Sequence, residues 1–196
     1  RHGYGHTIPP HLVNYRANLW ALAREAKADR IVSVASVGGI RADLTPGTLV
    51  VPHQIIDYTW GRDGSFLAET GGQVIHTDFT HPYDGELRRW ILEKAAECGE
   101  TVVDGAVYAA TQGPRLETAA EINRLERDGA DIVGMTGMPE AVLARELDVP
   151  YAALCVVANH AAGRGDSHSE IRFDGLEDIL HAAIGRARTV IARMCA

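Results

Sequence analysis

The residues from Tyr151 to Ala158 form an unbroken apolar run, and this run constrains the fold more than any other feature of the sequence. Apolar runs without alternating polar residues are typical of strands buried on both faces of a sheet that helices cover. Asn159 follows the run directly. Because open α/β sheets bind ligands at the carboxyl ends of their strands, Asn159 is either a residue that recognises a ligand through its amide or an ordinary turn residue.

Strand-like and helix-like segments alternate along the rest of the chain. Strands are predicted at 31–39, 48–58, 102–111, 132–135 and 151–158, and helices at 12–26, 86–97, 117–127, 139–147 and 173–194. The stretch 60–80 has no clear period, which predicts a long loop or an irregular hairpin. The alternation predicts an α/β fold with a mainly parallel sheet and helices on both faces. No internal domain boundary is visible.

Composition narrows the possible partners and the location. The 196 residues are 46% hydrophobic and carry a formal net charge of -7. This acidic balance argues against nucleic acid or an anionic membrane as a partner, since both attract clustered Lys and Arg. Cys98, Cys155 and Cys195 are widely spaced, which suggests neither a disulfide framework nor a metal cluster and favours a cytoplasmic location. No signal-like segment and no stretch long enough to span a bilayer is present.

Three predicted strand ends carry candidate binding groups. The small residues from Ala35 to Gly39 either let backbone N–H groups approach an anion or form a tight turn. Gly113-Pro114 forces a turn before Glu117, which either reads a ligand or complements the dipole of the helix it begins. Thr136 stands at a strand-to-helix turn, where its hydroxyl either caps the helix or binds phosphate.

These segments, in this order, resemble the purine nucleoside phosphorylase and methylthioadenosine phosphorylase family over nearly the whole chain. The matching pieces are Arg1-His2-Gly3, the run 11–18, the strand end Val37-Gly38-Gly39, the Pro46-Gly47 turn, the run 113–118, the turn 135–140 and Asn159. The resemblance implies a three-layer α/β/α fold and a homotrimer with sites at subunit interfaces. It also implies reversible phosphorolysis of purine nucleosides, with inorganic phosphate as co-substrate and no metal or organic cofactor.

Family members begin with a strand and a glycine-rich loop whose hydroxyl also binds phosphate. This chain opens on Arg1-His2-Gly3 without either of them. The resemblance therefore implies that residues 1–196 form a single phosphorylase domain that lacks its N-terminal strand and glycine-rich phosphate loop, so activity of these residues alone is open.

The resemblance assigns one group of residues to phosphate. Its ligands would be Arg1, His2, the Ser36 backbone and the Thr136 hydroxyl. Such a set makes physical sense, because a dianionic nucleophile needs charge-assisted donors that aim it at C1' of the ribose.

A second group would bind the nucleoside. Met135 would line the ribose, and Val37 and Leu116 would pack against the base. Glu117 would accept a hydrogen bond from N1–H of a 6-oxopurine. Asn159 would accept from N7–H and donate to O6, which stabilises the purine as it leaves with its electrons. Asn159, Glu117 and Thr136 are thus the expected catalytic residues.

Two positions bear on the substrate. Asn159 implies a 6-oxo base, because adenine-specific members have Asp there. Ungapped counting places Phe173, with Leu176 one turn on, where inosine and guanosine phosphorylases bind the 5'-hydroxyl through His. An apolar pair disfavours a hydroxyl by about 1–3 kcal/mol. It implies S-methyl-5'-thioinosine as substrate, unless Phe173 only anchors the last helix. His76 matches a residue that a neighbouring subunit contributes near the 5' end, or is a surface histidine.

Other functions remain open at this stage. The chain could be a general inosine and guanosine phosphorylase or a methylthioadenosine phosphorylase. A nucleosidase would use water and would need no Arg1-His2 pair or Thr136 hydroxyl directed at phosphate. A non-catalytic nucleoside-binding protein would keep Asn159 and Glu117 but would release no base.

Overall fold

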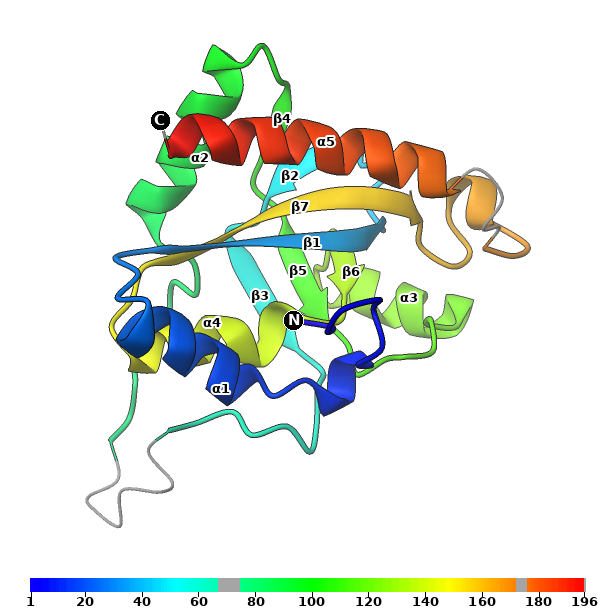
Figure 1. The fold of residues 1–196 in the computed structure, drawn as a ribbon. Coiled ribbons are helices and arrows are strands. Elements are labelled where there is room, and N and C mark those ends of the chain that lie inside the picture. The colour runs from blue at the N-terminus through cyan, green and yellow to red at the C-terminus, as the bar shows by residue number, and fades with distance from the viewer. Residues whose placement is uncertain (67–74, 172–175, 196) are drawn as a thin grey trace.

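A seven-stranded sheet forms the centre of the molecule in the computed structural model, which describes residues 1–66, 75–171 and 176–195 (Figure 1). The strands are β1 (Ile31–Gly39), β2 (Leu49–Val51), β3 (Gln54–Asp57), β4 (Val102–Asp104), β5 (Val107–Ala110), β6 (Ile132–Gly134) and β7 (Tyr151–His160). The α-helices are α1 (Tyr15–Trp20), α2 (Gly85–Glu97), α3 (Ala119–Arg127), α4 (Gly137–Glu146) and α5 (Leu176–Met194). Shorter helical turns are η1 (Pro10–Leu12), η2 (Ala21–Glu25) and η4 (Gly165–Ser167).

The sheet order is β3-β5-β6-β1-β7-β2-β4. The pairs β1–β7, β2–β4, β3–β5 and β5–β6 are parallel, while β1–β6 and β2–β7 are antiparallel. The prediction of a mainly parallel sheet is therefore confirmed, with an antiparallel junction on each side of the central β1–β7 pair.

Helices cover both faces of the sheet, as Figure 1 shows: α2 and α5 lie on one face and α1 and α4 on the other. Side chains of β7 alternate between the two layers. Ala153 and Cys155 belong to the core that includes α1 and α4, and Ala152 and Leu154 belong to the core that includes α2 and α5. The apolar run of β7 is therefore buried on both faces, which is why its sequence shows no alternation of polar residues.

Two predicted strands are each divided in the structure. The segment 48–58 forms β2 and β3, which lie in different parts of the sheet, because Pro52 has no N–H to continue the ladder. The segment 102–111 forms β4 and β5, with Gly105 between them at φ +96°. Both breaks occur where the chain passes from one part of the sheet to another.

Two helix predictions also need correction. The helix expected from Glu117 begins at Ala119, because the Thr118 side chain caps it in a capping box with Glu121. Glu117 therefore lies outside the helix, and its interpretation as a first-turn residue was wrong. The segment 12–26 is not one α-helix but η1, α1 and a π-helical η2. Its buried residues are Val13, Tyr15, Leu19 and Ala23, whereas Leu12 and Leu22 are exposed.

The strand from Ile31 ends in Gly38-Gly39 as predicted, so the alternative of a tight turn at these glycines is wrong. A Cβ on Gly39 would overlap the carbonyl oxygen of Leu44, which explains the need for glycine there. None of the helices among the described residues is long and apolar enough to cross a membrane. The three cysteines are free thiols.

Candidate functional site

A cavity of about 360 Å³ lies over the second half of β1, between the end of β6 and the end of β7. Since β1 and β6 are antiparallel and pair only at Gly38–Val133 and Gly39–Ile132, the two strand ends overlap. β7 runs parallel to β1 on its other side, and its register places Asn159 opposite Gly38. The sheet topology thus brings three segments that are distant in sequence to one cavity.

Most of the predicted site residues line this cavity. They are Arg1, His2, Ser36, Val37, Leu116, Glu117, Met135, Thr136 and Asn159. His76 is exposed and does not line the cavity within one chain. Phe173 and the side chain of Leu176 lie outside the described residues.

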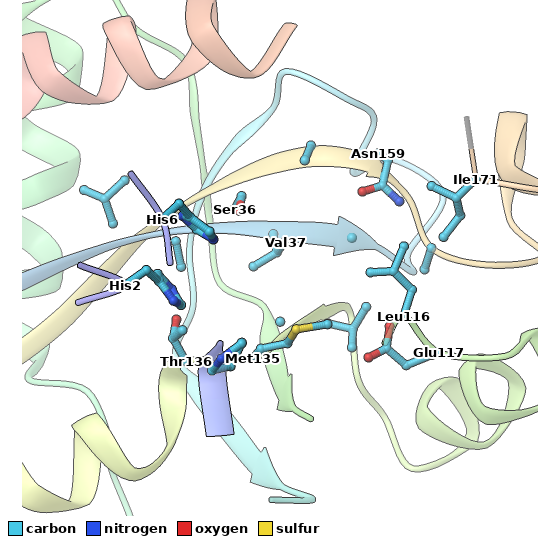
Figure 2. Close-up of a pocket in the computed structure, with 18 of the residues that line it drawn as sticks. His2, His6, Ser36, Val37, Leu116, Glu117, Met135, Thr136, Asn159 and Ile171 are labelled. Atoms are coloured by element: carbon cyan, nitrogen blue, oxygen red, sulfur yellow. The ribbon is translucent and has the colours of Figure 1, made fainter. Parts of the chain in front are cut away.

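The lining groups separate into two ends (Figure 2). His2, His6 and Thr136 lie at one end, and Asn159, Glu117, Leu116 and Ile171 lie at the other, with Met135 and Val37 between them. We call these the polar end and the amide end. The cavity therefore presents imidazole and hydroxyl groups at the polar end, which Arg1 lines next to His2, and an amide and a carboxylate at the amide end.

The N-terminal turn supplies two histidine rings to the polar end. His2 Nδ1 donates to the carbonyl of Ile8 at 2.9 Å, and its ring stacks on that of His6 with centroids 4.4 Å apart. Burial lowers the pKa of His2, and the nearby charges of His6 and Arg1 act in the same direction. Because Nδ1 carries the hydrogen in neutral His2, Nε2 is an acceptor until the ring is protonated.

Thr136 is buried, with 7% of its surface exposed. It occupies the N-cap position of α4, yet its side chain makes no capping hydrogen bond. Its backbone N–H lies 3.4 Å from the hydroxyl of Tyr108. The capping interpretation of Thr136 is therefore wrong, and the residue lies in the cavity wall.

Arg1 is held more tightly than its predicted role suggests. Its Nε donates to Glu140 Oε1 at 2.5 Å and its Nη2 donates to Glu140 Oε2 at 2.9 Å. Further bonds run to Ser33 Oγ at 2.7 Å and to the carbonyl of Val34 at 3.0 Å. Burial alone would lower the pKa of Arg1, but the charge and hydrogen bonds of Glu140 raise it. The guanidinium is thus fixed at the cavity wall by protein partners.

The amide end is held by fewer contacts. Thr111 Oγ1 donates to Glu117 Oε1 at 2.7 Å. Asn159 Nδ2 donates to the carbonyl of its neighbour His160 at 2.6 Å, which leaves its second amide hydrogen and Oδ1 for a ligand. Leu116 and Ile171 add apolar surface beside these groups.

Arg62 joins the two ends from outside the cavity. Its guanidinium donates to the carbonyls of Met135 at 2.8 Å, Met138 at 2.6 Å and Gln112 at 2.8 Å. It also lies over the ring of Tyr15, 5.3 Å from the centroid. These bonds fix the backbone beside Thr136 and the segment that leads to Glu117.

Sequence reasoning did not identify several of these residues. They are His6, Arg62, Thr111, Glu140 and Ile171. The second histidine of the N-terminal segment was a usable signal for His6. Arg62 lies in a stretch without a period, and Ile171 lies in a loop, so neither position had a pattern that could have identified it.

Among the described residues, no group of three or more His, Cys, Asp or Glu side chains could hold a metal ion. The lining side chains themselves offer charge and hydrogen bonding, which suit an anion at the polar end and a partner with adjacent donors and acceptors at the amide end.

Comparisons with known proteins identify the family of the chain. The sequence pattern of the phosphorylase superfamily matches residues 1–196. A probable S-methyl-5'-thioinosine phosphorylase of Pseudomonas syringae pv. tomato is 50% identical over 194 residues, which cover 99% of this chain and 78% of that protein. A probable 6-oxopurine nucleoside phosphorylase of Dictyoglomus turgidum is 47% identical over 174 residues, which cover 87% of this chain and 65% of that protein.

A solved structure shares the fold. Methylthioadenosine phosphorylase from Schistosoma mansoni in complex with adenine superimposes with a TM-score of 0.89 at 28% identity, covering 98% of this chain and 73% of that one.

Proposed function

Because the chain belongs to the phosphorylase superfamily, we propose that it catalyses phosphorolysis of S-methyl-5'-thioinosine to hypoxanthine and 5-methylthioribose 1-phosphate. A phosphate oxygen attacks C1' as the C1'–N9 bond breaks, and the electron pair of that bond leaves with the purine. The observation that carries this proposal is the two-ended cavity, with Thr136 and His2 at one end and Asn159 and Glu117 at the other.

The polar end binds the nucleophile. Arg1 supplies positive charge, and the uncapped Thr136 hydroxyl and the Ser36 backbone supply donors. Neutral His2 accepts a hydrogen bond from a protonated phosphate oxygen through Nε2, or donates to phosphate once protonated. Together these groups hold phosphate near C1' and lower the entropy lost in reaching the transition state.

The amide end stabilises the leaving purine. The proton that the phosphate loses on bonding to C1' ends on the purine; once N7 carries it, Asn159 Oδ1 accepts from N7–H, and the second amide hydrogen of Asn159 donates to O6. Glu117, oriented by Thr111, accepts from N1–H with its other carboxylate oxygen. Negative charge develops on the purine as the bond breaks, so a donor aimed at O6 acts more strongly in the transition state than in the ground state. Met135, Val37 and Leu116 enclose the ribose and the base.

A methylthio group is the proposed 5' substituent. The support is the name of the Pseudomonas relative, together with the apolar residues Phe173 and Leu176 that the sequence places near the 5' end. The relative from Dictyoglomus is named for the wider class of 6-oxopurine nucleosides, which makes general inosine and guanosine phosphorolysis the second candidate.

The proposed enzyme is a cytoplasmic homotrimer that needs no metal or organic cofactor. His76 reaches the site of a neighbouring subunit in this arrangement, and its exposure on the single chain is consistent with that role. Leu12, Trp60 and Ile75 are large apolar side chains with 67%, 73% and 62% of their surface exposed, which a subunit interface would cover.

Base release measured with and without phosphate tests the function. We expect the full-length protein to release hypoxanthine from S-methyl-5'-thioinosine only when phosphate is present, and faster than from inosine. Equal rates without phosphate would show a nucleosidase, and binding without release would show a nucleoside-binding protein. If inosine or methylthioadenosine is turned over faster, that nucleoside is the substrate in place of S-methyl-5'-thioinosine.

A further inference from the structure

Glu140 has no role in the chemistry proposed above, although it belongs to the same turn as Thr136. It lies in the first turn of α4, and only 4% of its surface is exposed. Its carboxylate accepts hydrogen bonds from Arg1, Ser33 and Tyr151. A buried carboxylate requires such partners, and the positive end of the helix dipole adds to its stability. The cluster can therefore hold an ionised carboxylate in one geometry.

The contact between Glu140 and Arg1 is bidentate. Both carboxylate oxygens receive bonds from the guanidinium, at 2.5 and 2.9 Å. With the bonds to Ser33 and Val34, four of the five N–H donors of Arg1 are engaged. Such a fork fixes the plane of the guanidinium as well as its position.

Glu140 acts on the cavity only through Arg1. Arg1 lines the cavity beside His2 and Ser36, whereas Glu140 is not among the lining residues and instead borders a separate hollow with Arg1 and Tyr151. Burial and the charge of Glu140 raise the pKa of Tyr151, so its hydroxyl remains protonated and donates to Oε2 at 2.9 Å. Tyr151 thereby restricts the carboxylate that restricts Arg1.

We propose that Glu140 is a positioning residue for phosphate, which it serves by fixing the guanidinium of Arg1 at the cavity wall. This inference rests on the proposed function, since it takes the anion beside Arg1 to be inorganic phosphate. Glu140→Gln retains one acceptor but turns an amide N–H group toward the guanidinium. The variant loses the bidentate contact, and the Arg1 guanidinium leaves its present orientation.

The test varies phosphate and nucleoside separately in the full-length protein. Glu140→Gln is expected to raise KM for phosphate by about tenfold while KM for the nucleoside changes by less than about twofold. Arg1→Ala raises the phosphate KM directly. The double variant is expected to be no worse than Arg1→Ala, because both changes remove the same interaction.

A matched control lies on the same helix. Glu146 accepts from Ser65 Oγ at 2.8 Å and from the Phe66 N–H at 2.7 Å, away from the cavity. Glu146→Gln should lower the melting temperature without changing the phosphate KM. If Glu140→Gln does not fold, Tyr151→Phe removes one hydrogen bond to Glu140 and should raise the phosphate KM by roughly twofold to threefold.

Two results would overturn the inference: an unchanged phosphate KM in the folded variants, or an equal rise in the KM of both substrates, which would indicate a general structural role. Phosphate-independent base release by the wild type would instead overturn the proposed function. Calorimetric titration of phosphate into wild type and Glu140→Gln would then still decide the role of Glu140, because that measurement needs no turnover.

Discussion

The two ends of the cavity differ in how firmly the protein holds its binding groups. At the polar end, Arg1 is fixed by a bidentate contact to the buried Glu140. At the amide end, Asn159 is held by one bond to an adjacent carbonyl and Glu117 by one bond from a hydroxyl. Phosphate is common to the family reaction, whereas the base differs among relatives. Under the proposed function, base choice resides in the end that can change with the least disturbance to packing.

The largest effect is expected at Asn159. Asn159→Asp removes the donor to O6 and places a carboxylate against a carbonyl oxygen. Turnover of 6-oxopurine nucleosides should fall by roughly tenfold to a thousandfold, or about 1–4 kcal/mol. Activity on methylthioadenosine should stay low in this variant, because Glu117 still faces an N1 without a proton, and should rise when Glu117→Ser is added. Values of kcat/KM for both bases measure this, and an unchanged base preference would show that Asn159 does not contact the purine.

Thr136→Ala tests the polar end without disturbing a helix cap. Loss of a hydroxyl that binds a charged ligand should raise the phosphate KM by about tenfold, corresponding to about 1.5 kcal/mol. The unfolding midpoint should hardly move, because Thr136 makes no capping bond. Thr118→Ala is the control: it breaks the capping box of α3 and should lower stability by about 1 kcal/mol without altering the phosphate KM. The reverse pattern would place Thr136 in the fold rather than in the site.

Phe173→His tests the position that the resemblance assigns to the 5' substituent. A partner for the 5'-hydroxyl should improve inosine relative to S-methyl-5'-thioinosine by about fivefold to tenfold in kcat/KM. A constant ratio would mean that the ungapped counting from Asn159 is wrong or that Phe173 only packs in the core. The substrate would then be reassigned to 6-oxopurine nucleosides in general.

Thr111→Val should have the smallest effect. It keeps the shape of the side chain but frees Glu117 Oε1 from its only hydroxyl donor in the described part of the chain. We expect KM for the nucleoside to rise by roughly twofold to fivefold, within the usual net value of one hydrogen bond. The phosphate KM should not change. Equal changes in both values would show that the two ends are not independent at this position.

Much of the fold could be predicted because its signals are local. The run of β7 shows burial on both faces, and the strand ends that carry Ser36, Thr136 and Asn159 follow from the same alternation. The division of 48–58 into β2 and β3 could not be read in the same way, since those strands pair with different partners across the sheet.

The contacts that support the site could not be predicted from local sequence patterns. Glu140 has the position of an ordinary first-turn acid, and only the tertiary structure shows that it pairs with a residue 139 positions away. Arg62 binds carbonyl groups, which every residue possesses, so no sequence pattern marks its partners. The assignments of the lining residues came from resemblance, while the residues that hold them in place came from geometry.

The hydrogen bonds from Arg62 to backbone carbonyls limit how the substrate specificity of this enzyme can evolve. One guanidinium bonds both to Met135, next to Thr136, and to Gln112, in the segment that leads to Glu117. A substitution that moves either backbone segment also displaces the other. Mutations that move the backbone at Gln112 while changing the choice of base should therefore also change phosphate affinity, and compensating changes are expected among the residues around Arg62.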